Sequence, residues 1–584
     1  MRCILGLLGL AATIRALDQV PLKQEERPNI IVVLTDDQDL HMDSINYMPL
    51  LKKHIIDHGT FYKHHYCSTA ICCPSRVTLW TGRNAHNTNV TDVFPPYGGY
   101  PKFVAQGFNE NYLPVWLQDS GYNTYYTGKL FNAHTVDNWN SPHPAGWTSS
   151  DFLLDPHTYQ YLNATFQRNE NPPVSYQGQY ATDILAEKAY GLLDEGVYSK
   201  KPFFLTVAPV APHSNVDSNT FRDPNGEGDP LDEIHMTAPI PAERHRHLFP
   251  GVKVPRTANF NPDKPSGASW IKHLAKLTDE VLTYNDNFYR ARLQALQAVD
   301  ELVDGIVTRL SNYGILENTY ILYTTDNGYH ISQHRLNPGK ECGFEEDINI
   351  PLIIRGPGVP VGEADIVTAH TDLAPTILKL AGGDWKRDDL DGSPIPLDQN
   401  SIRREKVTRQ EHVNVEFWGR GIPEGVYRFS LDDGRVVSYG SNNTYKALRV
   451  IGQNYNLYYS VWCTNEHELY DLATDPGQLT NIHPSVAPSS STQPLVLGFP
   501  VSKVLPRLDA LLMVTKSCKG YTCTHPWSVI HPNGDVRSLR DALDEKFDAF
   551  YLGEVASRVQ FEKCELGYII ESEGPQEAVA FDGL

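Results

Sequence analysis

Two pairs of oxygen-bearing residues follow apolar runs that are typical of buried strands. The pair Asp36-Asp37 comes directly after the β-branched run 29–35, and the pair Asp326-Asn327 follows a second such run. If the two strands are neighbours, the four side chains meet at one edge of a sheet. Carboxylate and amide oxygens favour a hard divalent cation such as Ca²⁺ or Mg²⁺. Either pair by itself also suits a turn or a helix cap, where Asp and Asn are common.

Residues 72–83, with the sequence CCPSRVTLWTGR, are a second candidate for reactive chemistry. A turn containing proline, followed by a helix with apolar residues inside, explains this string without any function. A cysteine nucleophile explains it as well, because a cation such as Arg76 favours the reactive thiolate of a nearby cysteine. These residue types alone leave both interpretations open.

The complete twelve-residue string resembles the signature of the sulfatase family. In that family, Cys-x-Pro-Ser-Arg with a downstream Thr-Gly directs the oxidation of the first cysteine to formylglycine. Here that residue would be Cys72, and Cys73 would remain a thiol. The resemblance covers about residues 27–480 and is nearest to secreted fungal arylsulfatases and N-acetylglucosamine-6-sulfatases. Further family-like segments are Thr35-Asp36-Asp37-Gln38, Gly128-Lys129, Ala211-Pro212-His213, Thr325-Asp326-Asn327-Gly328-Tyr329-His330 and Lys340.

The resemblance implies one divalent cation, Ca²⁺ or alternatively Mg²⁺, beside a formylglycine derived from Cys72. One hydroxyl of the hydrated formylglycine would attack sulfur and expel the alcohol or phenol. The other would then lose its proton and expel inorganic sulfate, while the cation lowers the pKa of the nucleophile. The implied metal ligands are Asp36, Asp37, Cys72, Asp326 and Asn327.

The resemblance also implies cations that bind the anionic substrate. Lys129, His213 and Lys340 would hold sulfate oxygens. His213 or Lys340 would donate a proton to the leaving oxygen, and Arg76 would support the formylglycine diol. A lysine at a strand end or a histidine in a loop is otherwise usually solvated.

One position departs from the family pattern. Many sulfatases carry a histidine two residues after the lysine that matches Lys129, but this chain has Phe131 there, followed by Asn132. A proton-shuttling histidine is therefore not expected at this point. Asn132 and His330 are candidates for contacts with the substrate. His330 suits a structural role equally well, and His134 is expected at the surface.

The candidate residues gather just past the carboxyl ends of predicted strands. Apolar runs at 29–35, 122–127, 203–207 and 320–325 each lead into one family-like segment. A helix precedes the last of them, because apolar residues from Leu293 to Leu310 recur at spacings of three and four. Alternating strands and helices predict an α/β sheet, and such sheets bind ligands at this edge.

A different pattern begins at about Arg403. Short aromatic and β-branched runs at 413–418, 435–439, 444–451 and 455–462 predict a smaller antiparallel sheet, with a helix near 505–514. The family resemblance implies an alkaline-phosphatase-like fold, in which helices sandwich a mixed, largely parallel sheet. We therefore expect a catalytic domain over residues 27–402 and a smaller C-terminal domain of antiparallel sheet plus helix over 403–584.

Composition excludes several classes of function. The 584 residues are 41% hydrophobic and 21% charged, as in soluble globular proteins. Lys and Arg total 50 against 70 Asp and Glu, a net charge of −20 that repels nucleic acids. No internal stretch reaches the roughly 18 apolar residues that span a bilayer, so no membrane anchor is expected. The sequence does not indicate an oligomeric state.

The N-terminus resembles a secretory signal peptide over residues 1–16, with a basic start and an apolar run from Ile4 to Ile14. A mitochondrial presequence or a buried helix are the alternatives. Secretion, or delivery to a vacuole or lysosome, would bring the chain past the formylglycine-generating enzyme. Cys518 and Cys523 are close enough to form a disulfide. Sequons at Asn89, Asn163 and Asn442 are candidate glycosylation sites, although single sequons often occur by chance.

The leading hypothesis is hydrolysis of aryl sulfates. Sulfated sugars of the N-acetylglucosamine-6-sulfate type, and phosphoesters or phosphonate monoesters, are alternative substrates, because sulfate and phosphate sites share a metal and cations. A catalytically dead secreted binding protein is a non-enzymatic alternative. The choice of substrate depends on pocket loops, including residues 215–266.

Overall fold

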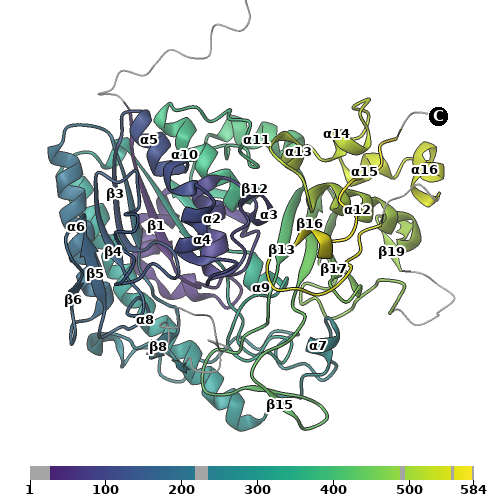
Figure 1. Ribbon diagram of the computed structural model, residues 1–584, viewed down its shortest axis with the longest axis horizontal. Helices are drawn as coiled ribbons and strands as arrows, with labels where there is room; N and C mark the ends of the chain where they lie inside the picture. Colours follow the sequence, from purple (N-terminus) through teal and green to yellow (C-terminus); the bar gives the residue numbers. More distant parts are fainter. Residues whose placement is uncertain (1–26, 218–234, 487–493, 554–557, 582–584) are drawn as a thin grey trace, which may run out of the picture.

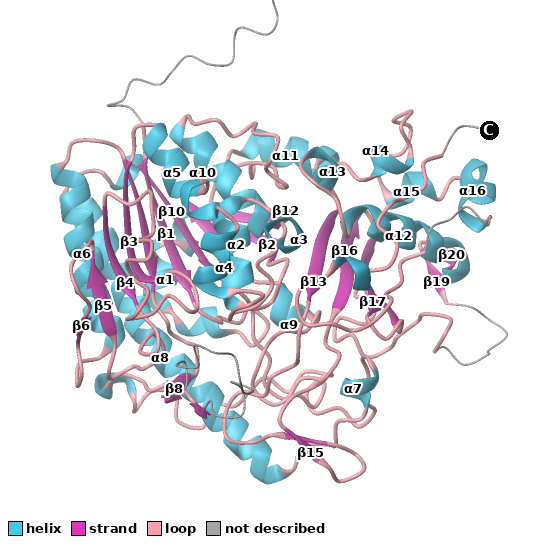
Figure 2. Cartoon of the chain, in the orientation of Figure 1, coloured by secondary structure: helices cyan, strands magenta, loops and turns pink. Residues whose placement is uncertain are grey.

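A computed structural model describes residues 27–217, 235–486, 494–553 and 558–581 (Figure 1). The predicted signal peptide lies outside these residues. The chain forms a ten-stranded sheet covered by helices and, beside it, a four-stranded sheet that belongs to the C-terminal part (Figure 2). Within the described residues, no helix has the length and apolar character needed to cross a membrane.

The large sheet is mixed, and its centre is parallel. Strands β10, β1, β7, β3 and β4 run parallel, whereas β11, β5 and β6 are antiparallel to their neighbours. This confirms the predicted sheet, and the four strands expected from the sequence occupy the adjacent positions β10-β1-β7-β3. In sheet order the strands are β12 Gly362–Ala369, β2 Thr60–Tyr66, β11 Leu352–Arg355, β10 Thr319–Thr325, β1 Asn29–Thr35, β7 Phe203–Ala208, β3 Asn123–Lys129, β4 Ser149–Leu153, β5 Thr165–Arg168 and β6 Val174–Ser175.

Helices cover both faces of this sheet, which explains why residues 30–34 of β1 are all apolar. Val32 packs into the core under one set of helices and Val33 into the core under the other, because successive side chains point to opposite faces. The first face carries α2 Cys72–Thr81, α4 Gly99–Ala105, α5 Leu113–Asp119 and α10 Leu373–Ala381. The second carries α1 Pro49–His54, α6 Ala181–Tyr198 and the long α8 Asp279–Asn312, which contains the predicted helix (Figure 1).

The C-terminal sheet is antiparallel in the order β13-β16-β17-β18. One face packs against α12 through residues such as Leu448 and Leu508, and the other packs against the first part of the chain through Val415 and Tyr66. The bounds are β13 His412–Phe417, β16 Tyr445–Gly452, β17 Tyr455–Trp462, β18 His467–Asp471 and α12 Val501–Thr515.

One predicted strand of this sheet is wrong. Residues 435–439 do not join it, because only Val436–Val437 are extended, as β15, and they pair with β14 Phe429–Ser430 in a separate hairpin. The predicted disulfide between Cys518 and Cys523 is present, and Cys463 pairs with Cys564. The cysteines Cys67, Cys72, Cys73 and Cys342 are free and buried in the described part of the chain.

Candidate active site

The register of two central strands brings the two oxygen-bearing pairs together. Thr35 at the end of β1 faces Thr325 at the end of β10, so the residues that follow lie side by side. The Oδ1 atom of Asp326 accepts a hydrogen bond from the backbone N of Asp37 at 3.0 Å, and the Asn327 amide donates to Asp37 Oδ1 at 2.8 Å. Asp36, Asp37, Asp326 and Asn327 are all fully buried.

Cys72 is the first residue of α2, whose ten residues are all buried between the sheet and its covering helices. Its Sγ lies 3.5 Å from Asp36 Oδ1. Arg76 follows four residues later on the same helix face, where its Nε donates to Asp326 Oδ2 at 2.8 Å. Burial raises the pKa of the Cys72 thiol well above its usual range, which does not favour a simple thiolate nucleophile.

Each of the three predicted substrate-binding cations contacts Asp36 or Asp37. Lys129, the last residue of β3, has its Nζ 2.6 Å from Asp36 Oδ2. The Lys340 Nζ lies 2.8 and 2.6 Å from the two carboxylate oxygens of Asp37. His213 Nε2 lies 3.5 Å from Asp37 Oδ2. The sequence prediction therefore identified side chains that the fold does bring into one cluster.

Opposite charges stabilise one another in this buried cluster. Burial alone would raise the pKa of Asp326, but Arg76 and Lys129 lower it below its ordinary value. Burial and the nearby Asp326 carboxylate raise the pKa of Asp36. Burial opposes the charge of Lys340, yet the carboxylates around it, led by Asp37, raise its pKa well above the ordinary value. The cluster thus holds fixed charges of both signs in a site closed to bulk water.

The donor set fits a hard divalent cation. Asp36, Asp37, Cys72 and His213 each place one potential ligand atom within 4.8 Å of the others. In the described residues, the buried Oδ1 atom of Asn327 has no hydrogen-bond partner, which leaves an oxygen ligand free. Carboxylate and amide oxygens are the ligands that Ca²⁺ and Mg²⁺ prefer, and an oxygen in place of the Cys72 sulfur would add to this set.

Glu424 is a site residue that sequence reasoning missed. Its Oε1 lies 3.1 Å from Lys340 Nζ, and its Oε2 accepts hydrogen bonds from Tyr329 OH at 2.8 Å and from the Ser214 hydroxyl. Lys340 and His213 overcome the effect of burial and lower the pKa of Glu424 to about 2. Glu424 belongs to an irregular loop after β13, so no periodicity or strand end marks it in the sequence.

Tyr159 is a second residue that the sequence did not indicate. Its ring stacks on His213 with centroids 4.2 Å apart, and Lys129 Nζ lies 4.7 Å from the ring centroid. The Asn132 amide donates to the Tyr159 hydroxyl at 2.7 Å. Asn132 therefore lies beside the cations of the site, and contact with substrate remains a prediction for it.

The two remaining histidines differ in their surroundings. His330 is buried, and its Nδ1 lies 2.8 Å from Asp347 Oδ1, an arrangement that fixes the ring next to the Lys340 segment. The prediction that His134 lies at the surface is wrong. His134 is fully buried between Tyr100 and Phe152, and burial lowers its pKa to about 3. The aromatic side chains that cover it come from distant parts of the chain.

Comparisons with known proteins agree with this geometry. Residues 28–383 match the sulfatase family. The chain is 39% identical to an arylsulfatase of Volvox carteri over 94% of this chain and 82% of the relative. It is 32% identical to the N-acetylglucosamine-6-sulfatase of Homo sapiens over 89% of this chain and 88% of that protein.

A solved structure shares the fold at lower sequence identity. The protein in that structure is described in complex with its substrate D-glucosamine-2-N,6-O-disulfate. It superposes on this chain with a TM-score of 0.60 at 21% identity, over 78% of this chain and 93% of its own. The chain belongs to the sulfatase family, and it is an enzyme of that family.

Proposed function

We propose that the protein hydrolyses sulfate monoesters with a formylglycine formed from Cys72. The observation that carries the proposal is the position of Cys72 at the start of α2, 3.5 Å from Asp36 and within the cluster that contains His213. Ca²⁺ is the cation that we propose, with Mg²⁺ as the alternative, because the ligand atoms are oxygens. The ligands would be Asp36, Asp37, Asp326, Asn327 and residue 72.

The side chains of the site divide the remaining tasks in this proposal. When bound, the cation supplies a lowered pKa for the nucleophile and polarises a sulfate oxygen. Lys129, His213 and Lys340 bind the other sulfate oxygens, since each already contacts a carboxylate at this point of the sheet. His213 or Lys340 gives a proton to the leaving oxygen, and Arg76 holds the carboxylates in place.

We propose aryl sulfates as the substrates. Two relatives named arylsulfatase, from Volvox carteri and Chlamydomonas reinhardtii, support this choice with 39% and 36% identity over 94% and 90% of this chain. Sulfated sugars are the second candidate, because the N-acetylglucosamine-6-sulfatase of Homo sapiens matches 89% of the chain.

We also propose that the protein enters the secretory pathway. The signal-peptide pattern of residues 1–16 supports this, and so do the two disulfides, which persist in oxidising compartments. The same route would expose the chain to the enzyme that generates formylglycine.

Turnover of three purified esters tests the proposed reaction. The protein is incubated with nitrophenyl sulfate, nitrophenyl phosphate and N-acetylglucosamine 6-sulfate in the presence of Ca²⁺ or Mg²⁺. We expect fast release of nitrophenol from the sulfate and little from the phosphate. Preference for the sulfated sugar would identify a sugar sulfate as the substrate and would still support hydrolysis of a sulfate monoester. Turnover of the phosphate alone, or of none of the three esters, would contradict the proposal.

A further inference from the structure

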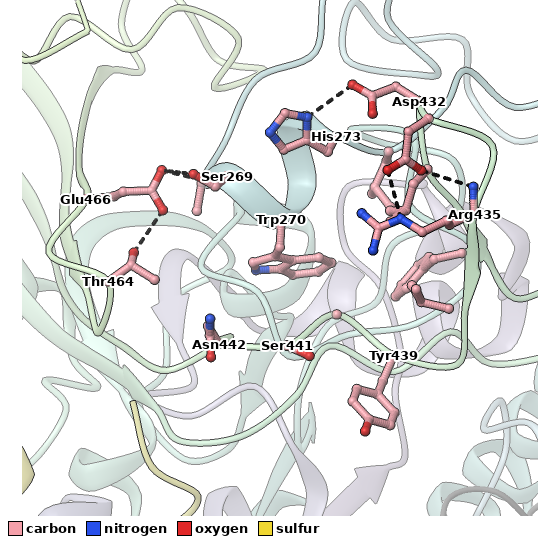
Figure 3. Close-up of a pocket in the computed structure, with 17 residues that line it drawn as sticks. Ser269, Trp270, His273, Asp432, Arg435, Tyr439, Ser441, Asn442, Thr464 and Glu466 are labelled. Atoms are coloured by element: carbon pink, nitrogen blue, oxygen red, sulfur yellow. Dashed lines mark hydrogen bonds and ion pairs between the residues drawn. The ribbon is translucent and has the colours of Figure 1, made fainter. Parts of the chain in front are cut away.

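A pocket of about 550 Å³ lies apart from the candidate active site, on the side of the β14–β15 hairpin. Helix α7, Ser269–Lys272, forms one wall and the hairpin another. Figure 3 shows Trp270 in the middle of the lining residues, with Ser441 and Asn442 on one side of its ring and His273 on the other. None of the proposed metal ligands or sulfate-binding residues lines the described walls of this pocket.

The Trp270 indole contributes a flat apolar surface to the pocket. It rests against two glycines, because a Cβ on Gly440 would come within 2.3 Å of the ring and one on Gly421 within 2.6 Å. These glycines pair with each other through backbone hydrogen bonds of 2.9 and 2.7 Å. Within the described residues, the buried Nε1 of Trp270 has no hydrogen-bond partner. A ligand for this surface therefore has one flat apolar face and polar groups at its edge.

Carboxylates line the pocket on both sides of the ring. Glu466 is held by the backbone N of Ser269 at 3.0 Å and by the Thr464 hydroxyl at 2.8 Å, and Asp432 contacts His273 at 3.1 Å (Figure 3). Such carboxylates accept hydrogen bonds from hydroxyl and amide groups. An aromatic surface with acceptors at its rim matches a sugar ring, whose C–H face is apolar and whose hydroxyl groups lie at the edge.

The residue that would carry the sugar lies in the same wall. Asn442 begins the sequon Asn442-Asn443-Thr444, is exposed, and adopts a left-handed conformation (φ 62°) that asparagine tolerates. In the described structure its side-chain amide makes no hydrogen bond. The Asn163 amide, in contrast, donates to Gln160 Oε1 at 2.7 Å. Asn442 thus combines an exposed amide that makes no hydrogen bond with a place in the wall of this pocket.

We propose that this pocket is the binding site of the N-linked glycan of Asn442. The first N-acetylglucosamine packs its apolar face on Trp270 and donates hydrogen bonds to Glu466. The covalent link keeps the sugar at a high effective concentration, so even a weak contact is occupied. The inference rests on the proposed secretion of the protein, because N-glycosylation occurs on that route, and it does not involve the sulfatase chemistry.

Protection of the native glycan tests this site. The protein is secreted from a eukaryotic host as wild type, Trp270→Ala, Trp270→Phe and Trp385→Ala. Trp385 is the matched control, since it lines a different pocket that contains no sequon residue. Each protein is treated, without denaturation, with an endoglycosidase that cuts within the core of N-linked glycans. Mass spectrometry of the Asn442 peptide then gives the rate of release at that position.

We expect the Asn442 glycan to be released roughly tenfold faster from Trp270→Ala than from wild type, with Trp270→Phe in between and Trp385→Ala unchanged, because an aromatic contact is worth about one factor of ten. Equal rates in wild type and both Trp270 variants would overturn the inference, and so would an unmodified Asn442 in secreted protein. Aryl sulfate turnover, measured on the same samples, is expected to be unchanged by these variants. A wild-type protein that does not turn over the aryl sulfate would count against the proposed function. Protection of its Asn442 glycan by Trp270 would still support the glycan-binding pocket.

Discussion

The carboxylate of Glu424 helps to determine the position of Lys340 in this site. It lies 3.1 Å from Lys340, whose ammonium group also contacts Asp37. Two acidic groups thus hold one cation between them, and this fixes the position and orientation of the Lys340 ammonium group. Glu424 is therefore a positioning residue for Lys340 in the proposed reaction.

Replacing Glu424 with glutamine removes the negative charge of the side chain and nearly preserves its shape. Glu424→Gln keeps an acceptor for Ser214 and Tyr329 but removes the negative charge beside Lys340. We expect kcat to fall by about ten- to a hundredfold because Lys340 loses its orientation. We expect KM to fall as well, because one charge that repels the sulfate is gone. Steady-state kinetics on nitrophenyl sulfate gives both values.

The matched control is Tyr329→Phe, which removes one hydrogen bond to Glu424 and no charge. It should lower kcat less and leave KM near the wild-type value. Wild-type kcat and KM in Glu424→Gln would show that Lys340 does not depend on this carboxylate.

A second prediction concerns Asp326, one of the proposed metal ligands. Asp326→Asn keeps the size of the side chain but removes a buried negative charge that Arg76 and the proposed cation both need. We expect turnover to fall by more than about a hundredfold and the bound Ca²⁺ to be lost. Metal analysis of the purified variant, together with its thermal midpoint, checks this. A variant with full metal content and normal turnover would exclude Asp326 as a ligand.

The close packing of the end of β3 against β7 requires glycine at position 128. Gly128, which precedes Lys129, has φ of 108°, and a Cβ there would come within 2.0 Å of the backbone oxygen of Ala208 in β7. Gly128→Ala should therefore separate β3 from β7 and displace Lys129. We expect a loss of more than about 2 kcal/mol in the free energy of unfolding, with a fall in turnover. Denaturant unfolding and kinetics measure the two effects.

Gly191 in α6 provides the comparison, because a Cβ at this position would meet no atom within 4 Å beyond its chain neighbours and the backbone of its own helix. Gly191→Ala should stabilise the protein by about 0.5–1 kcal/mol, as alanine does in a helix interior. If Gly128→Ala were as stable and active as wild type, the close approach of β3 and β7 would not matter for the site.

The central strands could be predicted from the sequence because their composition is unambiguous. Residues 30–34 are apolar throughout and mostly β-branched, as in a strand buried on both faces, and they form the middle of β1. The pairs Asp36-Asp37 and Asp326-Asn327 could be placed for the same reason, since they directly follow β1 and β10, whereas Lys129 and His213 were indicated by the resemblance to sulfatases.

Other features depend on contacts between distant segments. Glu424 reaches Lys340 from a loop some eighty positions further along the chain, and nothing local indicates that approach. His134 is covered by Tyr100 and Phe152, which the sequence does not place beside it. The run 435–439 has the composition of a strand, but only a pairing partner decides which sheet such a short run joins.

A buried ion network joins the segment that follows α2 to the C-terminal sheet. His86, in α3 (Ala85–Thr88), has its Nδ1 2.8 Å from Glu416 Oε2 in β13 and its Nε2 2.8 Å from the backbone oxygen of Cys518. Lys446 in β16 also contacts Glu416 at 2.8 Å. Both ring nitrogens of His86 face acceptors, so the geometry favours the protonated ring. Burial opposes this charge, but Glu416 outweighs it and raises the pKa of His86 above 6.5.

This network predicts how stability depends on pH. A pKa that is higher in the folded state than in the unfolded state stabilises the protein at pH values below the unfolded pKa of about 6.5, and the gain disappears as the pH rises through the folded pKa. His86→Gln should cost about 1.5–3 kcal/mol at pH 6 and less at pH 9. Thermal midpoints of both proteins at the two pH values test this. An equal deficit at both, or a larger one at pH 9, would show that His86 is not charged in the folded protein.

The account as a whole depends on the chemical state of residue 72. The mass of the peptide that contains Cys72, taken from active protein secreted by a eukaryotic host and labelled with a hydrazine, tests it most directly. We predict an aldehyde in place of the Cys72 thiol, in a fraction of molecules that rises in proportion to specific activity, while Cys73 stays a thiol. An unmodified Cys72 thiol in fully active protein would contradict the proposed sulfatase mechanism.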